Sequence, residues 1–141
     1  MANNVFVDTN IILDIFLERE LFFEDSQKVI LDLVENNFVP YLSGSSVTDI
    51  YYICKKSGMD RDTILKKLEK LLEVFEVLII DKDVIMDAIS SEIKDFEDAV
   101  QMMACKTQMI DFIITRNKKD FKIDGIQVKT PREFFISGVN T

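Results

Sequence analysis

Several carboxylates and one amide in this chain stand where apolar runs end or helical patterns begin: Asp8, Asp49, Asp98, Asn117 and Asp120. In an α/β protein the carboxyl ends of parallel strands meet at one edge of the sheet, where ligands and catalytic groups collect. Oxygen ligands of this kind suit Mg²⁺ or Mn²⁺. If the strand order brings these positions together, they form a cation site capable of phosphodiester hydrolysis.

Simpler structural roles are open to each of these residues. Asp8 and Asp95 are placed to cap helices, and Asp98 is placed to complement a helix dipole. Asp49 and Asp14 suit solvated helix positions, and Asp120 suits a turn. Only their convergence would distinguish a site from this set of ordinary roles.

The composition narrows the chemistry. The chain has 141 residues and no His, which excludes His-based triads and His-ligated zinc. Its net charge of −8 argues against broad electrostatic binding of nucleic acid, although bound cations would invert the local field. An acidic surface also suits solvation alone or a basic protein partner. No apolar run is long enough for a membrane span and no signal peptide is evident, so we expect a cytoplasmic protein.

Apolar periodicity predicts strands that alternate with helices. Strands are expected at 5–8, 38–42, 75–80, 112–115 and 126–128, with 75–80 as a buried parallel strand and Pro40 favouring an edge position or strand start. Helices are expected at 10–19, 25–36, between Ser46 and Ser57, 60–74, 83–90, 95–108 and from Thr130 onward. Cys54 and Cys105 lie in apolar helical patterns and are expected to be reduced core thiols. The alternation predicts one α/β domain over 1–141 with a mostly parallel sheet.

Four motifs in this order resemble the PIN domain, across essentially the whole chain. They are Val-Asp-Thr-Asn-Ile-Ile-Leu-Asp at 7–14, Ser-Val-Thr-Asp at 46–49, Asp-Phe-Glu-Asp-Ala at 95–99 and Ile-Thr-Arg-Asn-Lys-Lys-Asp-Phe at 114–121. The ending Thr-Pro-Arg-Glu-Phe at 130–134 fits as well, and residues 17–26 are similar to the bacterial branch that includes VapC-like toxins. The resemblance implies a three-layer α/β/α fold with a central, mostly parallel sheet. It also implies a Mg²⁺- or Mn²⁺-dependent endoribonuclease.

The resemblance also implies roles for single residues. Asp8 and Asp98 would anchor the principal metal. Asp49 stands where the family usually has the longer Glu, so it would act directly or through a water. Asn117 stands where many members have Asp, and with Asp120 it would orient the attacking water or a second ion. By the same analogy, cleavage would leave a 5′-phosphate and a 3′-hydroxyl.

A second group is expected to contact the RNA substrate: Thr9, Asn10, Thr115, Arg116, Lys118 and Lys119. The two threonines are similar to the hydroxyl residues that the family places near its metal. The arginine and lysines lie beside the carboxylates and could bind phosphates, although a solvated loop is the simpler interpretation.

Three functional alternatives remain beside the nuclease. The nuclease itself would be either the toxin of a toxin–antitoxin pair or a housekeeping enzyme. For the toxin, the resemblance further implies a homodimer and a small antitoxin partner. A PIN-like module with decayed catalysis would bind RNA or protein without turnover, which the departures at Asp49 and Asn117 motivate. A receiver domain is disfavoured because Asp8 is followed by Thr-Asn rather than belonging to an acidic pair. An Asp-x-Asp phosphatase is disfavoured because residue 10 is Asn.

Overall fold

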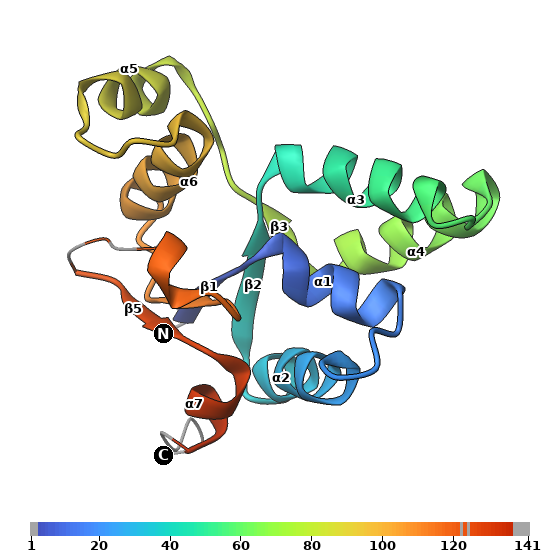
Figure 1. The fold of residues 1–141 in the computed structure, drawn as a ribbon. Helices are drawn as coiled ribbons and strands as arrows, with labels where there is room; N and C mark the ends of the chain where they lie inside the picture. The colour runs from blue at the N-terminus through green and yellow to red at the C-terminus, as the bar shows by residue number, and fades with distance from the viewer. Residues whose placement is uncertain (1–2, 122, 124, 137–141) are drawn as a thin grey trace.

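A computed structural model describes residues 3–121, 123 and 125–136 of the chain, with a parallel sheet at its centre (Figure 1). The five strands lie in the order β3-β2-β1-β4-β5, and every neighbouring pair is parallel. They are β1 (Asn3–Val7), β2 (Phe38–Leu42), β3 (Glu76–Val77), β4 (Phe112–Ile114) and β5 (Gln127–Lys129). The strand order puts the earliest strand in the middle, so the chain builds the sheet outward in both directions.

Helices cover both faces of this sheet. Side chains alternate along a strand, and β1 directs Val5 and Val7 to one face and Phe6 to the other. The first face packs against α1 (Thr9–Phe16), α2 (Phe23–Glu35), α3 (Gly44–Lys56), α4 (Arg61–Val74) and α7 (Pro131–Ile136). The second face packs against α5 (Lys82–Ser90) and α6 (Phe96–Thr107), which lie together on the other side in Figure 1. The expected three-layer α/β/α fold is confirmed.

The expected strand at 75–80 is the largest departure from the sequence prediction. Only Glu76–Val77 forms a strand, which is parallel as predicted. Both residues are exposed at the edge of the sheet, so the predicted length and burial of this strand are wrong. The apolar run instead contributes Phe75 and Leu78 to the two cores on either side. Pro40 lies in β2, which is an inner strand, but β3 pairs with β2 only at Tyr41 and Leu42. One side of Pro40 therefore has no strand neighbour that would need its missing N–H.

Polar side chains cap the starts of four helices, among them the helix that begins after Asp95, whose capping role the sequence predicts. Ser43, Asp60, Asp81 and Asp95 each accept a hydrogen bond from the backbone amide three residues further on. The end of α2 is marked by Asn37, whose φ of 64° is a left-handed conformation that Asn tolerates well. Local sequence signals thus set the element boundaries to within a few residues.

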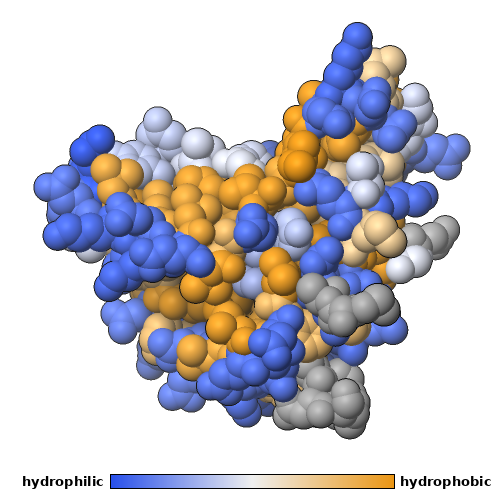
Figure 2. Space-filling model, turned by 180° about the vertical axis from the view of Figure 1, so that it is seen from behind, coloured by the Kyte–Doolittle hydropathy of each residue, from blue (hydrophilic) through white to orange (hydrophobic). Residues whose placement is uncertain are grey.

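The surface carries many apolar side chains beyond the two cores. Figure 2 shows them gathered across the middle of one face of the molecule. Large exposed examples lie on α2, α4, the β3 edge and α5, including Leu31, Leu72, Ile79 and Ile89. In the part of the chain that the structure describes, no helix is long and apolar enough to cross a bilayer. Cys54 and Cys105 are buried and unbridged, as the sequence predicts.

Truncation of a core residue next to the site should show how far the fold depends on the central strands. Ile113 in β4 is fully buried, so Ile113→Ala should lower the free energy of unfolding by about 2–5 kcal/mol in urea denaturation. Ile89 on α5 is 61% exposed, and Ile89→Ala should change the free energy of unfolding by less than about 0.5 kcal/mol. Equal losses in the two variants would contradict the assignment of the core.

Candidate active site

Parallel pairing brings the carboxyl ends of β2, β1 and β4 together as three adjacent strands. The residues that follow β1 and β4 are Asp8 and Thr115, and the backbone N–H of Asp8 donates to the carbonyl of Ile114 at 2.9 Å. A cavity of about 250 Å³ opens beside Asp8 at this edge. Five carboxylates from separate parts of the chain line it: Asp8, Asp49, Glu97, Asp98 and Asp120. The sequence prediction that acidic residues converge at this edge is therefore realised by the fold.

Asp8 is the most enclosed of these carboxylates. It occupies the position that precedes α1, but its side chain makes no capping hydrogen bond to that helix. Its Oδ2 instead accepts a hydrogen bond from the Thr115 hydroxyl at 2.8 Å. Burial raises the pKa of Asp8, and the negative charge of Asp120 adds to that rise, while the Thr115 hydrogen bond opposes it. The fold thus holds an anion in a setting that disfavours its charge.

Asp98 enters the same cavity from the opposite side of the sheet edge. It lies in the first turn of α6, where Asp95 caps the helix by accepting from the Asp98 backbone N–H at 2.9 Å. Burial is the main cause that raises the pKa of the Asp98 carboxyl. The negative charges of Asp95, Asp120, Glu97 and Asp8 raise it further, in that order. The capping role expected for Asp95 is confirmed, and it leaves the Asp98 side chain to the cavity.

The other carboxylates are more open to solvent. Asp49 lies on α3, lines the cavity and is exposed. Glu97 lines the cavity too, although sequence analysis assigned it no role. The signal was present, because Glu97 sits inside the acidic stretch at 95–98 beside two residues that were singled out.

Asn117 and Asp120 act as a pair on the loop after β4. The Asn117 side-chain amide donates to Asp120 Oδ2 at 2.8 Å, and its backbone N–H donates to the Thr115 hydroxyl at 3.0 Å. Asp120 lines the cavity, within the short 3₁₀ turn η1 (Lys118–Asp120). Asn117 carries no charge, but its amide holds the negatively charged side chain of Asp120 in place.

A chain of buried hydroxyls supports the floor of the cavity. The Thr9 hydroxyl lies 2.6 Å from the Ser46 hydroxyl, which lies 2.8 Å from that of Ser43. Gln101 Nε2 of α6 donates to Ser43 at 3.4 Å, so the chain links α1, α3 and α6. No pattern in the sequence distinguished Gln101. Thr9 and Asn10 both line the cavity, where a substrate would approach.

Two cationic side chains beside the cavity, those of Arg116 and Lys118, are paired with carboxylates inside the fold. Arg116 does not extend toward the cavity, because its guanidinium is paired with Asp14 through hydrogen bonds of 2.8 and 3.1 Å. Lys118 forms an ion pair of 3.0 Å with Glu133. Asp14, which the sequence favoured as a solvated helix residue, is completely buried, so that expectation is wrong. Lys119 is exposed on the same loop.

The donor set fits a hard divalent cation by its chemistry. Among the described residues, the charged groups that line the cavity are carboxylates, and the side-chain amides of Asn10 and Gln101 line it with them. Within residues 3–121, 123 and 125–136, no three acidic or thiol side chains already stand close enough to hold one ion. The residues that could close on a cation here are Asp8, Asp49, Glu97, Asp98 and Asp120.

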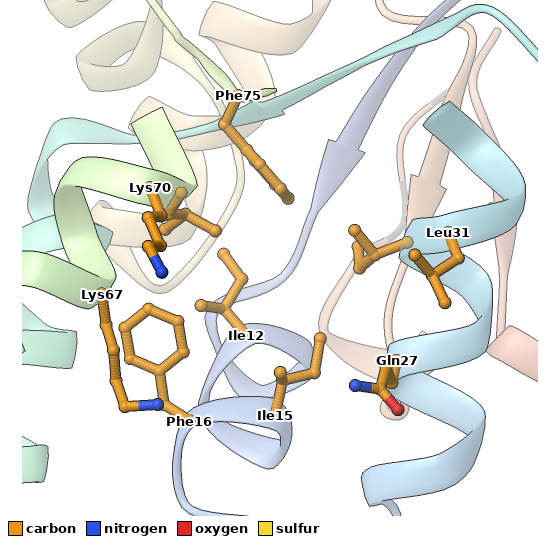
Figure 3. A pocket seen from close by; sticks show the side chains of 10 residues that line it. Ile12, Ile15, Phe16, Gln27, Leu31, Lys67, Lys70 and Phe75 are labelled. Carbon is orange, nitrogen blue, oxygen red and sulfur yellow. The ribbon is translucent and has the colours of Figure 1, made fainter. Parts of the chain in front are cut away.

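A second hollow differs in character and does not suit a cation. It lies between α1, α2 and α4, where Ile12, Ile15 and Phe75 point into it (Figure 3). Two lysines, Lys67 and Lys70, stand on its α4 side, and among the described residues no carboxylate lines it. Of these two hollows, the acidic cavity is therefore the one whose lining suits a cation.

Comparison with known families and structures agrees with this geometry. A family model described as PIN domain matches residues 4–119. Ribonuclease VapC1 of Aquifex aeolicus is 30% identical over 138 residues, which cover 94% of each chain.

Solved structures with the same fold include a toxin–antitoxin complex from Klebsiella pneumoniae. It has a TM-score of 0.67 and 23% identity, and the match covers 90% of this chain and 97% of that one. The sarcin–ricin loop cleaving toxin VapC20 of Mycobacterium tuberculosis has a TM-score of 0.59 and 15% identity, with 95% of each chain covered.

Asp8 is half-buried and its pKa is raised, so the stability of the metal-free protein should depend on pH in a definite direction. A carboxyl whose pKa is raised on folding stabilises the fold below its unfolded pKa and loses that contribution as pH rises through its folded pKa. Asp8→Asn, which mimics the protonated group, should therefore raise Tm at pH 7 in chelator, and the gain should vanish below about pH 3.5. Thermal melts across this range measure it.

The matched control is Asp87→Asn, which removes the same charge from an exposed position on α5. A gain in Tm at pH 7 that is equally large in the control, or that persists at acidic pH, would contradict the burial of a charged Asp8.

Proposed function

The chain belongs to the PIN domain family, and on that premise we propose that it is a Mg²⁺- or Mn²⁺-dependent endoribonuclease. The observation that carries the proposal is the convergence of five carboxylates from different elements on one cavity at the carboxyl edge of the sheet. The 30% identity to a ribonuclease over nearly the full length of both chains supports it. A purely structural cap or turn role does not explain why these residues meet.

In this proposal Asp8 and Asp98 hold the principal cation, with Asp49 as a direct or water-mediated ligand. When bound, the cation neutralises charge on the scissile phosphate and favours attack by water. Thr115 orients the Asp8 carboxylate through its 2.8 Å hydrogen bond, and Asn117 orients Asp120 in the same way. Asp120 and Glu97 stand close enough to the cavity to accept the proton of the attacking water or to hold a second ion.

The RNA would approach across the loop after β4 and the start of α1. Thr9 and Asn10 line the cavity, and Lys118 and Lys119 follow Asn117 on the adjoining loop. Lys118 would have to exchange its ion pair with Glu133 for a phosphate, which is a modest cost for an exposed pair. Because the chain carries a net charge of −8, the cation supplies most of the positive charge that the substrate meets.

We also propose that the protein is the toxin of a toxin–antitoxin pair and acts in the cytoplasm. The structures that share its fold include VapBC complexes, from Rickettsia felis with a promoter DNA fragment and from Haemophilus influenzae. A small antitoxin protein and a second copy of this chain are the partners this implies. The exposed apolar side chains on α2, α4, β3 and α5 are of the kind that protein partners cover.

Cation binding is the first test of the nuclease proposal. Calorimetric titration of Mn²⁺ into the chelator-treated protein should show binding that Asp8→Asn or Asp98→Asn removes. Each substitution should also reduce cleavage of total bacterial RNA by at least roughly 100-fold, equivalent to about 3 kcal/mol of transition-state stabilisation. Glu92→Gln, which removes a charge outside the cavity, is the control.

Two outcomes would redirect the proposal. Undiminished cleavage by both Asp variants would exclude this cavity as the active site. A folded wild type that binds RNA but neither binds Mn²⁺ nor cleaves would instead identify the non-catalytic PIN-like module.

A toxin should arrest growth through this same site. Induced expression of the wild type in a bacterial host should stop colony formation, whereas Asp98→Asn, at equal protein level, should not. Where a small gene adjoins the gene of this chain and encodes the antitoxin, its co-expression should restore growth. Normal growth with active wild-type enzyme would favour a housekeeping ribonuclease.

A further inference from the structure

Asp14 is an ionisable side chain that the proposed chemistry does not use, although it lies in α1, the helix that begins directly after Asp8. Its side chain is completely buried. Both carboxylate oxygens are saturated, because together they accept four hydrogen bonds from Arg19, Ser26 and Arg116. These donors come from the loop after α1, from α2 and from the loop after β4. This fully satisfied buried charge joins α1 to the start of α2 and to the loop after β4, which lies about a hundred residues further along the chain.

Arg116 is the strongest of these partners. Its Nε donates to Asp14 Oδ2 at 2.8 Å and its Nη2 donates to Oδ1 at 3.1 Å, which is the bidentate geometry that only arginine provides. The guanidinium also stacks on the Phe22 ring, 3.8 Å from its centroid. Arg116 is therefore fixed in position and in orientation.

The residues on either side of Arg116 carry the site. Thr115 donates to the Asp8 carboxylate, and the Asn117 amide donates to Asp120. The Asn117 backbone N–H donates in turn to the Thr115 hydroxyl, so both contacts belong to one hydrogen-bonded unit. The peptide at 115–117 thus contacts two cavity carboxylates directly, and its middle residue is anchored to Asp14.

We propose that Asp14 and Arg116 are positioning residues, whose ion pair fixes the 115–117 peptide and thereby sets Asp8 and Asp120 for a cation. The inference deepens the proposed function and rests on it. Partners outside a metal's own ligands orient those ligands, and their loss commonly lowers metal affinity or activity by about 10–100-fold.

This assignment differs from a phosphate-binding role for Arg116. A substrate-binding arginine would act alone, and removal of Asp14 would leave it free and improve RNA binding. A positioning arginine depends on Asp14, so either substitution produces the same defect. The two roles therefore predict opposite effects of Asp14→Asn.

The first test needs neither metal nor RNA. Hydrogen–deuterium exchange of the chelator-treated protein should be roughly tenfold faster at the Asn117, Asp120 and Phe121 amides in Asp14→Asn and in Arg116→Gln. The control is the exposed pair of Asp25 and Arg132, joined at 3.0 Å with the arginine 81% exposed. Asp25→Asn and Arg132→Gln should leave exchange at those three amides unchanged. Unchanged exchange in the Asp14 and Arg116 variants as well would overturn the proposal.

The second test links the anchor to the site. Asp14→Asn and Arg116→Gln should each weaken Mn²⁺ binding and lower kcat by roughly tenfold or more, with KM for RNA changed little. The double variant should lose no more than the worse single variant, because the two residues act as one unit. A raised KM with unchanged kcat in Arg116→Gln, beside normal behaviour of Asp14→Asn, would overturn the proposal and assign Arg116 to the substrate.

Arg116→Lys covers the case in which the other variants fail to fold. It keeps the positive charge but cannot make the bidentate contact, so it should fold and still show faster exchange and weaker Mn²⁺ binding. Wild-type values for both quantities would overturn the proposal. If the wild type itself binds no Mn²⁺ and cuts no RNA, the proposed function fails, while the exchange measurement still decides whether the pair anchors the loop.

Discussion

Like charges forced together at one sheet edge are the constraint on which the rest of this structure depends. Because β1 and β4 are adjacent and parallel, the residues that follow them lie side by side at the carboxyl edge of the sheet. Asp8 is delivered there by backbone geometry, and α6 brings Asp98 to the same cavity. Burial and mutual repulsion raise the pKa of both carboxyls. This arrangement lowers the free energy of unfolding of the metal-free protein. A bound cation would raise that free energy again.

Neighbouring hydrogen bonds keep the arrangement in place without neutralising it. Thr115 donates to Asp8, Asn117 donates to Asp120, and Asp95 takes over the helix cap that Asp98 would otherwise provide. Each of these partners is uncharged or negative. They orient the carboxylates and leave their charge uncompensated, which distinguishes a site awaiting a cation from a closed ion-pair network.

Apolar periodicity and capping residues were sufficient to predict most of the fold. They place the helices and the strand Phe38–Leu42 within a few residues, because those signals are local. The run at 75–80 misled the prediction, since apolar residues that face two separate cores resemble a buried strand. The site was predictable where motifs end strands. Gln101 and the burial of Asp14 were not predictable, because both depend on contacts between segments far apart in the sequence.

Asp8 and Asp14 show why residue type alone does not reveal function. Both are aspartates within one stretch of chain around α1, and both are removed from solvent to a large extent. Asp14 is surrounded by Arg116, Arg19 and Ser26, so its charge is matched inside the fold and it acts as an anchor. Asp8 receives a hydroxyl and further negative charge, so its charge is matched only when something positive enters from outside. Arginines pair with Asp14 and not with Asp8, so the Asp14 charge is balanced within the fold, whereas the Asp8 charge stays open to the cation that we propose.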